Sequence, residues 1–103
     1  MSAVFTSNRR PLLAQGAPAD ACKARYVTNE ERLAGCTAMI EAKTETGRSL
    51  AVAYCNRGFV LTEKKELDRA LADLEEAIKL DPSYACSFSN RGRVFALKGD
   101  LEK

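Results

Sequence analysis

The strongest constraint in this sequence is an internal repeat. From Ala51 the chain reads AVAYCNRGFVLTEKKELDR, and from Ala85 it reads ACSFSNRGRVFALKGDLEK. Seven of the 19 aligned positions are identical, and three of these form an Asn-Arg-Gly triplet in the same register. Two unrelated amphipathic helices would share classes of apolar residue, not such a triplet. The two copies begin 34 residues apart, an interval that is typical of chains that stack one supersecondary unit on the next.

The apolar residues after residue 19 recur at helical spacing, and no segment shows the alternation of a strand. The spacing predicts helices over about 20–27, 29–43, 49–62, 67–80 and 82–98. Short turns between amphipathic helices favour antiparallel neighbours. We therefore predict an all-α fold built from stacked antiparallel helical hairpins.

Three local signals predict where these helices begin and end. Thr28 and Glu31 have the spacing of a capping box before the second helix. Asp81 and Pro82 predict the start of the last helix, with Asp81 as its N-cap and Pro82 as its first residue. Gly99 is expected to end that helix in the left-handed conformation.

A helix–turn–helix unit that recurs after about 34 residues resembles the tetratricopeptide repeat. The positions that carry the family pattern are occupied in the full repeat by Tyr54, Gly58, Leu61, Ala70, Leu74, Ala77 and Pro82, and in the next by Phe88, Gly92 and Phe95. The Asn-Arg-Gly triplet is similar to a version common among bacterial members. The resemblance implies a short right-handed solenoid of about two and a half repeats.

Two positions of the triplet carry further expectations. Gly58 and Gly92 are expected to let the two helices of a hairpin approach closely. Arg57 and Arg91 stand where the family usually has leucine. We expect each arginine to pack its stem while its charged head reaches solvent or an acidic neighbour.

The chain divides into a leader and a repeat domain. The domain, residues 20–103, comprises an atypical first hairpin (20–46), a full repeat (51–84) and a partial repeat (85–103). Residues 1–19 lack a helical period and are interpreted either as a flexible leader or as an imperfect export signal with two arginines before a short apolar stretch. The second interpretation favours export to the periplasm, and the first leaves a cytoplasmic location open.

The resemblance also implies that the first helix of each repeat lines a concave, partner-binding surface. In this chain the candidate partner-binding residues are Cys55, Asn56, Phe59, Ser89, Asn90 and Arg93. The two asparagines are expected to hydrogen-bond a peptide backbone, the phenylalanine to hold an apolar side chain, and the arginine a carboxylate. The alternative is that these residues simply face water. The lysine–asparagine clamp for chaperone C-terminal carboxylates is absent, because Cys55 and Phe59 occupy its places.

The composition excludes several classes of function. There is no histidine, which is the commonest general base and metal ligand, so we expect no catalytic or metal site and no cofactor. A net charge of +2 offers no footprint for nucleic acid. No apolar run approaches the roughly 20 residues of a membrane helix, so we expect no membrane insertion. Carboxylates such as Asp68 and Asp73 are interpreted as a solvated helix face rather than as acid–base groups.

The sequence therefore predicts a non-enzymatic scaffold that binds a protein or peptide ligand. The alternative is a structural module that self-associates through its incomplete C-terminal repeat. There Phe88 and Phe95 lack the second helix that would cover them, and exposed aromatic residues mark interfaces.

Four cysteines leave the redox state open. Cys22 and Cys36 lie on facing sides of the first predicted hairpin, where either a disulfide or two buried thiols would fit. Cys55 and Cys86 are not expected to pair, because they lie on successive parallel helices of different repeats.

Overall fold

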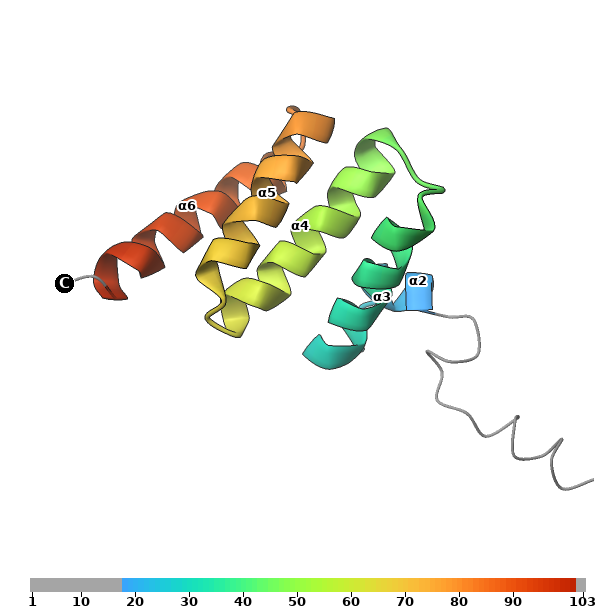
Figure 1. Cartoon of the computed structure of the whole chain (residues 1–103), viewed down its shortest axis with the longest axis horizontal. Coiled ribbons are helices and arrows are strands. Elements are labelled where there is room, and N and C mark those ends of the chain that lie inside the picture. The colour runs from blue at the N-terminus through green and yellow to red at the C-terminus, as the bar shows by residue number, and fades with distance from the viewer. Residues whose placement is uncertain (1–17, 102–103) are drawn as a thin grey trace, which may run out of the picture.

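The computed structural model describes residues 18–101, with side chains from residue 20 to residue 99. This part of the chain contains five α-helices and no strand, which confirms the predicted all-α fold. The helices are α2 (Pro18–Lys23), α3 (Asn29–Ala42), α4 (Gly47–Glu63), α5 (Leu67–Leu80) and α6 (Ala85–Leu101). They lie side by side, antiparallel from one to the next, from α2 and α3 at one end to α6 at the other (Figure 1).

The capping box predicted before the second helix is present. The Thr28 hydroxyl accepts a hydrogen bond from the backbone N–H of Glu31 at 3.0 Å. The Glu31 carboxylate in turn accepts from the backbone N–H of Thr28 at 2.9 Å. Two N–H groups that the helix itself cannot pair are thereby satisfied, which sets the start of α3 at Asn29.

The first helix is shorter than predicted. It ends at Lys23 instead of Val27, and it begins at Pro18, within the segment interpreted as a leader. Tyr26 lies beyond the helix with 92% of its surface exposed. Residues 1–17, the rest of the segment interpreted as a leader or export signal, lie outside the described residues.

Both predicted ends of the last helix are wrong. Its start is displaced to Ala85 because Asp81 closes a turn: the Asp81 carboxylate accepts from the backbone N–H of Ser83 at 3.0 Å, and its carbonyl accepts from that of Tyr84 at 3.1 Å. The turn uses the groups that would have capped a helix at Pro82. At the other end α6 continues through Gly99, because glycine permits the left-handed conformation but does not impose it.

The main hydrophobic core lies between α4, α5 and α6. Its buried members are Ala51, Cys55, Leu61, Leu67, Ala70, Leu74, Ala77 and Val94. The alanines keep the helices close. Gly58 does the same, since a Cβ added there would lie 2.9 Å from both Cγ and Cδ2 of Leu74 and 3.3 Å from the Ala70 carbonyl oxygen. The predicted close approach at Gly58 is therefore confirmed.

The equivalent expectation for Gly92 is wrong for the described residues. A Cβ added at Gly92 would meet nothing within 4 Å. The sequence position is the same in both repeats, but α4 has α5 against this face, whereas no described helix packs against it in α6.

Arg57 packs as the sequence predicts and reaches an acidic neighbour. Its guanidinium donates to both carboxylate oxygens of Asp73, at 2.7 and 2.9 Å, and to the Thr37 hydroxyl at 3.3 Å. The side chain of Arg57 is 18% exposed and that of Asp73 is 9% exposed. The hydrogen bonds to Asp73 raise the pKa of the Arg57 guanidinium above its ordinary value. This ion pair links α4 to α5, and through Thr37 to α3. The interpretation of Asp73 as part of a solvated face is wrong, because the carboxylate is buried.

Candidate functional site

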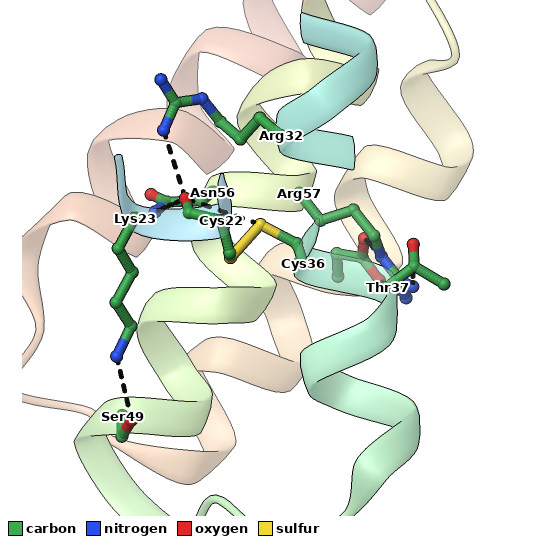
Figure 2. The surroundings of a disulfide bond; sticks show 9 residues. Cys22, Lys23, Arg32, Cys36, Thr37, Ser49, Asn56 and Arg57 are labelled. Carbon is green, nitrogen blue, oxygen red and sulfur yellow. Dashed lines mark hydrogen bonds and ion pairs between the residues drawn. A yellow bond between two sulfur atoms is a disulfide. The ribbon is translucent and has the colours of Figure 1, made fainter. Parts of the chain in front are cut away.

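The first hairpin is closed by a disulfide between Cys22 of α2 and Cys36 of α3, with both side chains wholly buried (Figure 2). The structure thus has the first of the two arrangements that the sequence left open. The Cys22 carbonyl oxygen also accepts hydrogen bonds from Arg32 at 3.1 Å and from Asn56 at 2.9 Å (Figure 2). A six-residue helix is too short to be stable alone, so these tertiary links hold α2 against α3 and α4.

The two asparagines of the repeated triplet each donate a hydrogen bond to a cysteine of an earlier helix, but to different kinds of acceptor. The Asn56 amide N–H donates to the backbone carbonyl oxygen of Cys22 in α2. The Asn90 amide N–H donates to the sulfur of Cys55 in α4 at 3.3 Å. It also donates to the sulfur of Cys86, in its own helix α6, at 3.5 Å. Each asparagine therefore uses one of its amide N–H donors in the contact between neighbouring helices. The sequence pattern did not indicate these two hydrogen bonds.

Phe59 and Arg93 occupy equivalent positions in the two repeats and lie together. The Arg93 guanidinium carbon is 5.7 Å from the centroid of the Phe59 ring, within the range of a cation–π contact. Arg93 also donates to the Glu63 carboxylate at 2.6 Å. The Phe59 residue is 38% exposed and the Arg93 side chain is 42% exposed. The result is an accessible apolar ring with a guanidinium held over it.

Glu63 was not identified from the sequence. It belongs to the last turn of α4, one turn after Phe59, and the internal repeat does not align it with Arg93. Helical spacing from Phe59 places a carboxylate on the same stripe. That spacing is a signal that could have indicated Glu63 as a partner for a cation on this surface.

Cys55 and Ser89 differ sharply in access, although the repeat aligns them. Ser89 is exposed on α6. Cys55 is wholly buried, and burial, followed by the neighbouring Cys86, raises the pKa of its thiol to about 12. Cys55 therefore lines the space between helices and does not reach the surface, whereas Ser89 can meet a partner.

Cys55 and Cys86 are both free thiols, which confirms the expectation that they do not pair. Their sulfur atoms are 3.1 Å apart. Cys86 stands one helical turn before the position that the repeat aligns with Cys55. The packing of α6 against α4 brings the two sulfurs together.

Two further expectations concern metals and membranes. Within the described residues, no group of three or more side chains of the kinds that bind metal ions comes together. Across residues 18–101, no helix combines the length and the apolar character needed to cross a membrane.

A comparison with protein families finds the tetratricopeptide repeat at residues 51–84, which span α4, α5 and the turn before α6. Comparisons with curated proteins and with solved structures found no match. The match covers the hairpin in which Gly58, Ala70, Leu74 and Ala77 are buried as that repeat requires. Residues 51–84 are therefore similar to a tetratricopeptide repeat, and the described part of the chain is all-α.

Proposed function

We propose that this protein is a scaffold that binds a protein or peptide partner on the surface formed by α4 and α6. Tetratricopeptide repeats generally mediate protein–protein interaction and typically do not catalyse reactions. The observation that carries the proposal is the contact between Phe59 and Arg93, which joins the two repeats on one exposed surface. No catalytic role is proposed.

The chemistry of this pair suits a binding anchor. Aromatic residues and arginine are enriched among the side chains that dominate binding energy. Glu63 and the Phe59 ring already orient the Arg93 side chain, so binding would order it at reduced entropic cost. A guanidinium has five N–H donors, so Arg93 can bind a partner's carboxylate in addition to Glu63. The favoured ligand is a segment with an apolar side chain next to an acidic group.

The roles proposed for the remaining candidate residues differ with their exposure. Ser89 lies one turn before Arg93 on α6 and is exposed, so it would contact the rim of the ligand. Asn56 and Asn90 are half-buried and hold the repeats together while offering their amide oxygens. Cys55 supports this surface from beneath, because it is wholly buried.

A second candidate function is self-association through α6. Phe88 and Phe95 are 41% and 51% exposed, and they flank Gly92, whose face is open. Arg91 lies over the Phe88 ring with its guanidinium carbon 5.3 Å from the centroid. This aromatic face is distinct from the anchor formed by Phe59 and Arg93, so the two proposals can be separated by mutation.

The experiment compares two double variants of the full chain. The wild-type protein first captures partners from a lysate of the native organism, and mass spectrometry identifies them. Binding of the captured partner is then measured for Phe59→Ala with Arg93→Ala, and for the matched control Phe88→Ala with Phe95→Ala. Helical circular dichroism establishes that both variants remain folded.

The first double variant should weaken binding about tenfold or more, since loss of one good anchor commonly removes at least about 1.4 kcal/mol. The control should bind as the wild type does. Equal affinity of both variants and the wild type would refute the proposed surface. Loss of binding or of self-association in the control alone would favour the second candidate function.

A further inference from the structure

Cys55 and Cys86 form a dithiol that the proposed scaffold function does not use. Their sulfur atoms are 3.1 Å apart, and neither is in a disulfide. A disulfide needs sulfur atoms about 2.05 Å apart, so closing the bond requires a movement of only about 1 Å. Cys55 lies in the middle of α4 and Cys86 in the first turn of α6, so the pair bridges two repeats.

The two thiols differ in the way that an attacking and a resolving cysteine differ. Cys86 is exposed, whereas Cys55 is wholly buried. A dissolved reagent can therefore reach Cys86 first, because thiol–disulfide exchange depends on access. Burial is the largest cause that raises the pKa of Cys55 to about 12, so Cys55 does not react directly with solutes.

Polar groups surround the pair inside the fold. The Asn90 amide donates to both sulfurs, at 3.3 and 3.5 Å. The Ser87 hydroxyl is wholly buried, and hydrogen bonds from Asn90 and Ser87 are among the influences that lower the pKa of Cys55 against its burial.

We propose that Cys55 and Cys86 are a site of thiol–disulfide exchange with low-molecular-weight disulfides of the glutathione class. Cys86 is the attacking thiol and Cys55 is the resolving thiol. The inference is independent of the proposed scaffold function, because it concerns a different pair of side chains and requires no protein partner.

The reaction has two balanced steps. The Cys86 thiolate attacks one sulfur of the small disulfide, so that a mixed disulfide forms on Cys86 and one small thiol leaves with a proton. The Cys55 thiolate then attacks the Cys86 sulfur, so that the Cys55–Cys86 bond forms and the second small thiol leaves. The protein loses two electrons and two protons, and the small disulfide gains both.

The second step benefits from the first. The hydrogen bond that the Cys55 thiol donates to Cys86, and the charge of Cys86, are two of the causes that raise the pKa of Cys55. Both disappear once Cys86 is part of a mixed disulfide. Cys55 is then easier to deprotonate, next to the sulfur that it must attack.

The chain contains one disulfide among its described residues, between Cys22 and Cys36. Both of those cysteines are wholly buried. The pair of Cys55 and Cys86 is the one with an accessible thiol.

The test exposes the folded full chain, with the Cys22–Cys36 bond intact, to glutathione disulfide. Samples are quenched over time by alkylation of the free thiols and analysed by intact mass and by peptide mapping. The variants are Cys55→Ser and Cys86→Ser, with Cys55→Ala as a second replacement for the buried position. Circular dichroism checks that each is folded.

In the wild type we expect a transient glutathione adduct on Cys86, followed by loss of two hydrogens and a Cys55–Cys86 bond. Replacement of Cys55 should leave a lasting adduct on Cys86. Replacement of Cys86 should abolish reaction at Cys55. A lasting adduct on the wild type, an adduct on Cys55 in the Cys86→Ser variant, or two unreacted thiols in the wild type would each overturn the proposal. The wild-type time course decides the matter even if neither Cys55 variant folds.

Discussion

Alanine at Gly58 and alanine at Gly92 should have opposite effects on stability, although the two glycines occupy the same place in the repeated triplet. At Gly58 a new Cβ would lie 2.9 Å from two atoms of Leu74 and 3.3 Å from a backbone oxygen of Ala70. One of the two atoms is the Leu74 branch point, which cannot move without the whole side chain. At Gly92 the new Cβ would meet nothing within 4 Å.

The expected changes in the free energy of unfolding follow from two contributions, helix propensity and core packing. Alanine in a helix interior is favoured over glycine by about 1 kcal/mol. Overpacking of a filled core costs roughly 1–3 kcal/mol, and the contacts at Gly58 favour the upper part of that range. Gly58→Ala should therefore destabilise the fold by about 1–2 kcal/mol, and Gly92→Ala should stabilise it by up to about 1 kcal/mol. For a domain of this size, 1 kcal/mol corresponds to roughly 4–8 °C in Tm.

Urea titration and thermal melts followed by circular dichroism measure both changes. Each variant serves as the control for the other, because the propensity term is shared and only the packing term differs. The reasoning would be refuted if Gly58→Ala were as stable as the wild type. It would equally be refuted if Gly92→Ala lost as much stability as Gly58→Ala.

Three further predictions concern the interactions that hold the hairpins together. Asp73→Ala should lower the free energy of unfolding by about 2–3 kcal/mol in a urea titration, because it leaves the Arg57 guanidinium without its carboxylate in a mostly buried place; a loss below about 0.5 kcal/mol would show that the pair is dispensable. Hydrogen bonds from Ser83 and then from Arg48 hold the pKa of Asp81 below its usual 3.8, so its contribution to stability is present above that pH and is lost as the pH falls through the lower, folded-state value. Asp81→Asn should therefore lose less Tm than the wild type between neutral and strongly acidic pH, and parallel curves would contradict this. Reduction of the disulfide between α2 and α3, which closes a loop of about 15 residues, should cost roughly 3 kcal/mol in the same titration, and an unchanged midpoint would count against its stabilising role.

Much of the fold could be predicted from the sequence, because its signals are local. The helical period and the capping box at Thr28 depend on neighbours within one or two turns, and the internal repeat can be read directly from the order of residues. The packing of Gly58 against α5 also followed, since the repeat predicts which helix faces that position. The main failure among the local signals was the start of α6, where Asp81 could either cap a helix or close a turn with Ser83 and Tyr84.

The candidate site could be predicted only in part. The internal repeat indicated that Phe59 and Arg93 occupy equivalent positions of successive repeats, and both are exposed. It could not indicate that Asn56 turns toward Cys22, or that Glu63 holds Arg93. Those pairings depend on how far one helix slides and rotates along the next, and a repeat length does not specify either quantity.

The cysteines show most clearly which features follow from the order of residues and which depend on the packing of the helices. Their positions on helix faces follow from the order of residues, and that order left the pairing of Cys22 with Cys36 open. The 3.1 Å contact between the sulfurs of Cys55 and Cys86 arises only from the packing of α6 against α4. The periodicity of the chain determines which residues face inward, whereas the packing of one hairpin on the next decides which of them meet, because contacts between helices depend on a relative placement that no single helix encodes.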